Sequence, residues 1–63
     1  MVTEIIDISG CKHRIVFKEV EFVNYEDDKG EITFKHKSKK NIKVTREIAE
    51  QFERDFINNS EYL

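Results

Sequence analysis

The chain has no proline, no tryptophan, one cysteine and two glycines in 63 residues. The single cysteine excludes an internal disulfide and argues against a secreted, disulfide-stapled domain, so we expect a cytoplasmic location. Residues 1–9 contain acids and lack the basic start of a signal peptide. No apolar run approaches the roughly 20 residues that span a bilayer. We expect one small domain over residues 1–63, folded on its own core or supported by a partner.

The chain also lacks a strong charge of either sign. Eleven lysines and arginines nearly balance thirteen aspartates and glutamates, which leaves a net charge of −2. This balance is neither the basic excess of a typical nucleic-acid-binding protein nor the strong acidity of a DNA mimic. The lysine-, isoleucine- and asparagine-rich composition is typical of AT-rich genomes, and by analogy of phage or mobile-element accessory proteins.

What the chain does contain is apolar alternation at a period of two. This pattern predicts strands over residues 2–8, 13–25, 31–37 and 42–44, with polar turns over 9–12 and 38–41. In the first strand Val2, Ile6 and Ile8 share one face. We therefore expect an antiparallel sheet built from consecutive strands.

The segment 13–25 contains a fault in its alternation. Ile15 and Phe17 have one parity, whereas Val20 and Phe22 have the other, so an unbroken strand could not face all four to one core. A β-bulge or a sharp bend near residues 18–19 would restore the phase. Such bent strands serve two sheets in small SH3-like barrels, so a half-barrel and an open sheet both remain possible.

A hairpin connection is expected over residues 26–30, with Gly30 supplying a positive φ. One register places Phe22 across from His36, and a tighter register places it across from Phe34. The same registers set Glu21 across from Lys37 or Lys35. Either register joins apolar to largely apolar residues and acid to base.

A helix is expected after Thr45, which can cap its first turn. Apolar residues recur at helical spacing until Asn58-Asn59-Ser60 ends it: Ile48, Ala49, Phe52, Phe56 and Ile57. The sequence does not decide whether Tyr62 and Leu63 pack on the sheet. The predicted fold class is α+β, a four-stranded antiparallel meander with one C-terminal helix packed on it.

No group of residues predicts catalysis, a cofactor or a metal ion. Cys11 and His13 lack a third orienting group, and together with a distant His36 they do not make the paired spacing of a zinc site. The acids of the hairpin loop lack the ligand spacing of a calcium site. The two glycines do not form a phosphate loop. We therefore expect that the protein is not an enzyme.

Basic residues are concentrated in one segment that contains no acid, and they are the candidate contacts for a nucleic acid or an acidic partner: Lys35, Lys37, Lys39, Lys40 and Lys43. Lys35, Lys37 and Lys43 should share one sheet face. The alternative is that these lysines only pair with Glu19 and Glu21 across the hairpin. A nucleic-acid site usually adds exposed aromatics, and the five phenylalanines all fall at predicted core positions, which leaves only Tyr25.

Ile5, Val16 and Val23 fall on the sheet face opposite the helix and are the candidate apolar interface. If the sheet is open, these residues would form a modest apolar patch that favours self-association or a protein partner. The sequence therefore predicts a small non-catalytic protein-binding or regulatory protein, which binds a protein partner or forms a homodimer. The alternative is a nucleic-acid-binding module that uses the lysine segment. No membrane association is expected.

Overall fold

The computed structural model describes residues 1–60, and Tyr62 and Leu63 lie outside this range. The chain is α+β, as expected. Its elements follow in the order β1 (Val2–Ile6), β2 (Lys12–Val16), the 3-10 turn η1 (Phe17–Glu19), β3 (Val20–Glu26), β4 (Lys29–Phe34), β5 (Ile42–Thr45) and α1 (Arg46–Ser60).

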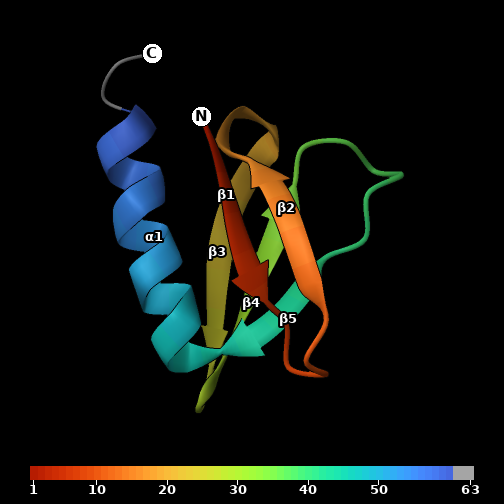
Figure 1. Cartoon of the computed structure of the whole chain (residues 1–63), viewed down its shortest axis with the longest axis vertical. Helices are drawn as coiled ribbons and strands as arrows, with labels where there is room; N and C mark the ends of the chain where they lie inside the picture. Colours follow the sequence, from red (N-terminus) through yellow and green to blue (C-terminus); the bar gives the residue numbers. More distant parts are fainter. Residues whose placement is uncertain (61–63) are drawn as a thin grey trace.

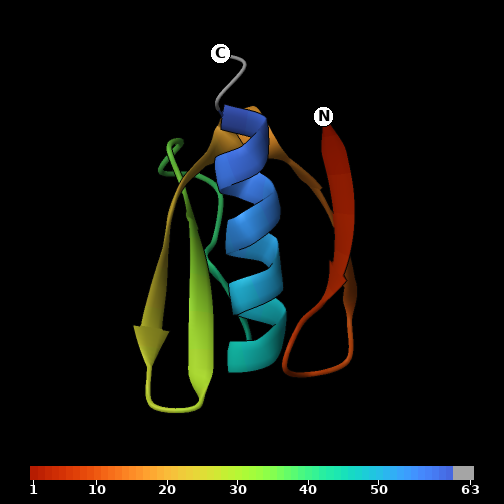
Figure 2. The same ribbon diagram turned by 90° about the vertical axis from the view of Figure 1, so that its left-hand side faces the viewer.

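The strands form two antiparallel sheets, one of β1 and β2 and one in the order β3-β4-β5, which do not close into a barrel. The prediction of four strands was wrong, because the segment expected as one strand over 13–25 is divided into β2 and β3. Figure 1 shows the two sheets joined at the top by the short segment between β2 and β3. Figure 2 shows α1 lying in front of the gap between them.

The division lies where the alternation is faulty, and the predicted bend near residues 18–19 is confirmed. Residues Phe17–Glu19 form a 3-10 turn, which changes the direction of the chain and restores the phase of its side chains. Phe17 at the start of the turn and Val20 directly after it are only 6% and 1% exposed. One turn therefore lets both sheets contribute to a single core.

The predicted hairpin between β3 and β4 forms, but its loop is shorter than expected and both predicted registers were wrong. Glu26 pairs with Lys29 and Tyr25 with Gly30, so the loop consists of Asp27 and Asp28 alone. Asp27, not Gly30, has the positive φ, at 54°. Aspartate tolerates this left-handed conformation better than most residues, which makes the two-residue turn accessible.

A second irregularity turns Phe22 to the outer face of the sheet. Val20 pairs with Phe34 but Phe22 pairs with Thr33, which leaves Glu21 as the extra residue of a β-bulge. The Thr33 hydroxyl stabilises the bulge by donating to the Phe22 carbonyl (3.0 Å) and accepting from the Phe22 amide (3.3 Å). Phe22 is consequently 46% exposed, and its predicted core position was wrong.

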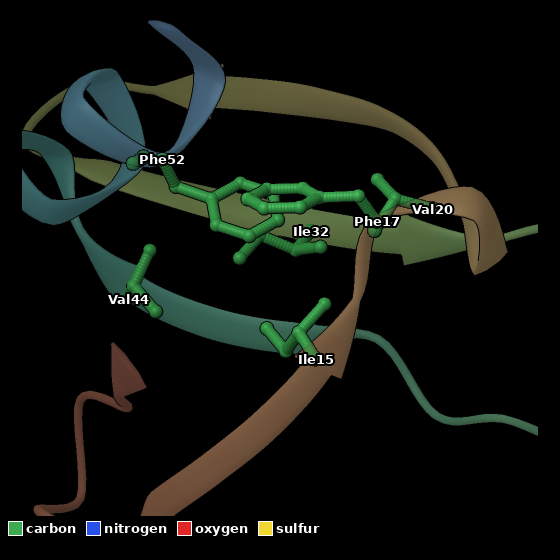
Figure 3. Packing of buried hydrophobic residues seen from close by; sticks show 7 residues of the cluster. Ile15, Phe17, Val20, Ile32, Val44 and Phe52 are labelled. Atoms are coloured by element: carbon green, nitrogen blue, oxygen red, sulfur yellow. The ribbon is translucent and has the colours of Figure 1, made fainter. Parts of the chain in front are cut away.

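The core lies between the two sheets and α1 (Figure 3) and is formed by apolar residues from five elements and the 3-10 turn: Ile15, Phe17, Val20, Ile32, Val44, Ala49 and Phe52. The rings of Phe17 and Phe52 lie 5.4 Å apart, and Phe56 extends the cluster with its centroid 6.3 Å from each. The aromatic cluster thus joins the bend to the helix.

The helix begins as the sequence predicts, and its predicted apolar stripe packs on the core except at Ile57, which is 50% exposed. The Thr45 hydroxyl accepts a hydrogen bond from the Ile48 amide at 3.3 Å, which confirms the predicted cap. Ala49 then approaches β4 so closely that a Cβ built on Gly30 would lie 2.2 Å from the Ala49 Cβ. Gly30 is therefore required for close helix–sheet contact, and not for a turn. Within residues 1–60, no helix has both the length and the apolar character needed to cross a membrane.

Candidate functional site

A groove of about 570 Å³ lies between the β1–β2 turn and the segment that leads into β5. The two walls are held together by a backbone hydrogen bond in which the Ile8 amide donates to the Lys43 carbonyl at 2.9 Å. The lining combines basic, apolar and turn residues from both sheets: Asp7, Ile8, Ser9, His13, Arg14, Phe34, Lys39, Lys40, Asn41, Ile42 and Lys43. We refer to it as the basic groove.

Asp7 organises the wall that the β1–β2 turn provides. Its Oδ1 accepts hydrogen bonds from the amides of Ser9 (2.8 Å) and Cys11 (2.9 Å), and Gly10 completes the turn with a φ of +92°. Its Oδ2 lies 2.6 Å from His13 Nε2. The hydrogen bonds from His13 and from the Cys11 amide lower the pKa of the Asp7 carboxyl. The Asp7 carboxylate is thus hydrogen-bonded to residues of the same wall of the groove.

The basic side chains of the groove differ in whether they form an ion pair. Lys39 Nζ lies 2.6 Å from Glu19 Oε1 and 5.6 Å from the centre of the Phe34 ring. Among residues 1–60, no ion pair joins Arg14, Lys40 or Lys43 to an acid. Within these residues the three side chains form no ion pair, although Arg14 lies across its ladder from Glu4 and Lys43 lies across its ladder from Glu31.

The structure brings together three of the five candidate lysines. Lys39, Lys40 and Lys43 line the groove, whereas Lys35 and Lys37 are exposed outside its lining. The expectation that Lys35, Lys37 and Lys43 share a sheet face was wrong, because β4 ends at Phe34 and the next seven residues form a loop. Within residues 1–60, the expected cross-pairing to Glu19 is found for Lys39 and for none of the other four lysines.

Sequence reasoning missed Arg14 and His13 as members of the groove. Both come from β2, and they reach the lysine segment only because the bend at η1 folds one sheet over the other. No local pattern around either residue indicates this contact. Arg14 lies across the β1–β2 ladder from Glu4 and is exposed.

The three candidate apolar residues are partly buried and do not form an exposed apolar patch. Ile5 and Val23 pack partly buried against the core, and Val16 is half-buried beside Val2. The apolar residues with larger exposed fractions in the first hairpin are Val2 (43%), Ile6 (49%) and Ile8 (48%). Ile8 lines the basic groove together with Ile42. The groove therefore offers apolar as well as basic contacts.

The other residues with reactive or metal-binding side chains lie apart from one another. Cys11 is exposed in the β1–β2 turn, and His36 Nδ1 lies 2.6 Å from the Ser38 hydroxyl. Within residues 1–60, no group of three or more histidine, cysteine, aspartate or glutamate side chains is arranged to hold a metal ion. Tyr25, the expected exposed aromatic, is half-buried beneath Arg46.

Comparison of the chain with protein-family models, with curated proteins and with solved structures finds no match.

Proposed function

We propose that the protein is a non-catalytic binding module whose basic groove takes an acidic, partly apolar segment of a protein partner. The observation that carries this proposal is the combination of three cations, none of which forms an ion pair within residues 1–60, with Ile8 and Ile42 in one groove. The three cations are Arg14, Lys40 and Lys43. Charged groups around an apolar centre are typical of protein interfaces, where the charges steer association and the apolar contacts hold it.

A protein partner is favoured over a nucleic acid by the aromatic residues. Single-stranded nucleic acids need flat rings that are free to stack on bases. The ring in the groove, Phe34, has Lys39 over it, and the ring of Tyr25 has Arg46 over it at 4.7 Å. The exposed ring of Phe22 lies outside the lining of the groove.

The arrangement of the two sheets supports the same proposal. Two short antiparallel sheets joined at a bend are compatible with the bent, SH3-like half-barrel that the sequence left open beside an open sheet, and the groove lies where their ends approach. A homodimer is the second form of the proposal, because α1 of another copy has four acids against two arginines and so carries a net negative charge that the groove would attract.

The test uses three labelled synthetic peptides of equal length: one of alternating glutamate and leucine, one of glutamate and serine, and one of glutamine and leucine. We expect the glutamate–leucine peptide to bind best and its affinity to fall with salt. Lys40→Glu combined with Lys43→Glu should weaken binding about tenfold or more, whereas Lys37→Glu, outside the groove lining, should not. Sedimentation measurements on the free protein separate the homodimer from the heterologous partner.

The proposal fails if the glutamine–leucine peptide binds equally well, or if the double variant binds as tightly as the unmodified protein. Tighter, salt-dependent binding of single-stranded DNA or RNA of matched length, lost in the same double variant, would support the nucleic-acid alternative instead.

A further inference from the structure

A second groove, of about 410 Å³, runs between β1 and α1. On one side it is lined by the four consecutive residues 3–6. Side chains of a strand alternate between its two faces, so four consecutive residues line one groove only when that groove follows the edge of the strand. The groove therefore exposes the backbone of β1, and Figures 1 and 2 both show β1 and α1 side by side.

The hydrogen bonds at the ends of β1 establish which backbone groups face this groove. The Met1 carbonyl accepts from Phe17, and the Asp7 amide donates to Cys11, so both point toward the β2 side. Backbone groups alternate along a strand, which places those of Thr3 and Ile5 on the β2 side as well. The N–H and C=O groups of Val2, Glu4 and Ile6 consequently point away from β2.

This outer edge is unpaired along β1 but is already used just beyond it. Within residues 1–60, β1 pairs with β2 alone. The next amide of the same alternation, that of Ile8, donates to the Lys43 carbonyl of β5 at 2.9 Å. The edge thus has the geometry for strand pairing, and β5 occupies only its last position. Unpaired strand edges of this kind are templates for another strand.

The far wall determines what can fit. It is one stripe of α1, formed by Ile48, Gln51, Phe52 and Asp55 at helical spacing. An added strand would lie about 4.8 Å from β1 on the side that α1 lines, and a further strand would lie about as far again in the direction of α1. A second copy pairing through its own β1 would bring its β2 toward this wall. The α1 wall therefore favours one extended segment over a second sheet.

The lining also indicates the side chains of such a segment. Ile48 and Phe52 favour apolar residues on the side that faces α1. Lys12, paired with Ile6, lies at the end of β1, whereas Asp55 lies about 10 Å along α1 from Ile48, toward the start of β1. A matching segment has an acid near Lys12 and a base near Asp55.

We propose that the edge of β1 takes an extended segment of about five residues from a partner protein as an added strand, with its alternate apolar side chains packed on α1. This site is separate from the basic groove, and the proposal does not rest on the function proposed for that groove.

The experiment selects peptides from a randomised seven-residue display library on the immobilised protein and removes those that also bind Glu4→Pro. Proline at position 4 removes the Glu4 amide, which faces the groove between the amides of Val2 and Ile6. Because this amide points away from β2, its loss breaks no hydrogen bond between β1 and β2. The matched control Glu4→Ala removes the carboxylate and keeps the amide. We expect selected peptides to bind the unmodified protein and Glu4→Ala alike, and Glu4→Pro about tenfold or more weakly.

A second measurement keeps the proposal falsifiable if Glu4→Pro does not fold. Each selected peptide is made in two N-methylated forms. One form is methylated at its odd-numbered amides and the other at its even-numbered amides, so that in an added strand only one form blocks the amides that face β1. Strand addition predicts that one form loses binding and the other keeps it, and that the Val2, Glu4 and Ile6 amides become protected from hydrogen exchange. Equal binding of both forms, no enrichment of any peptide, or protection of these amides by self-association alone would overturn the proposal.

Discussion

Tyr25 connects the second sheet to α1 through both its hydroxyl and its ring. The hydroxyl donates to Glu53 Oε1 at 2.7 Å, and the Arg46 guanidinium lies 4.7 Å from the ring centre. Burial, followed by the hydrogen bond to Glu53, raises the pKa of Tyr25 to about 12. The folded protein thus holds this phenol neutral at pH values where an unfolded chain would ionise it.

This difference predicts how stability depends on alkaline pH. A pKa that is higher in the folded state stabilises the fold below the unfolded value of 10.0, and the stabilisation is lost as the pH rises from there toward about 12. Urea unfolding across this range should show a steeper fall for the protein with Tyr25 than for Tyr25→Phe. Both proteins should carry Tyr62→Phe, so that no other tyrosine titrates. Parallel curves would contradict the prediction, because the lysines titrate equally in both.

At the scale of elements, the contact between α1 and β4 depends on two small residues. The space that a Cβ on Gly30 would need is filled by the Ala49 side chain, and both residues are buried. A larger residue at either position must push the helix away from the sheet. Interiors are close-packed, so such a shift would also loosen the aromatic contacts of Phe52 nearby on the same helix.

A double-mutant cycle tests this contact. Gly30→Ala should lower the free energy of unfolding by about 1–3 kcal/mol or more, because of overpacking. Ala49→Gly should cost about 1 kcal/mol through helix propensity. The double variant should be more stable than the sum of the two losses predicts, since the added methyl occupies the vacated space. Additive losses in chemical denaturation would show that the two side chains do not compete.

The elements also show what the sequence could and could not predict. The bend near residues 18–19 and the Thr45 cap depend on neighbouring residues, and both were predicted. The hairpin register was not, because Asp27 takes the left-handed conformation that Gly30 was expected to supply. The bulge at Glu21 depends on a hydroxyl from Thr33, eleven residues beyond Phe22, and a single bulge reverses the face of Phe22.

The basic groove was predictable only in part, because it too depends on contacts between residues that are distant in the sequence. Its lysines are adjacent in the sequence, so their clustering was visible. Arg14 joins them through the packing of two sheets, which the sequence pattern left open. The free edge of β1 is also a tertiary feature. The alternation of apolar residues along a strand shows which side chains face the core, but not whether a strand lies on each of its two edges.

At the scale of the whole molecule, packing is uneven between the two sheets. The helix packs on β3, β4, β5 and η1, and most of the buried core residues come from these elements. The β1–β2 hairpin contributes Ile15 alone from its strands to the fully buried set. A two-stranded hairpin has little stability of its own, so this part should open at a lower free energy than the rest.

Native-state hydrogen exchange measures this difference directly. We expect the β2-facing amides of Thr3 and Ile5 to be less protected than those of Ile32 and Val44, which lie in the three-stranded sheet under α1. Equal protection of both groups would instead show that the two sheets unfold as one cooperative unit.

The exposed Cys11 has a practical consequence for all of these measurements. It is the only thiol in the chain, and it lies in the turn that forms one wall of the basic groove. A maleimide dye or a spin label would therefore attach at a single known position without any mutation. Such a probe would sit beside the basic groove and at the tip of the hairpin that contains the β1 edge, where it can report both ligand binding and hairpin opening.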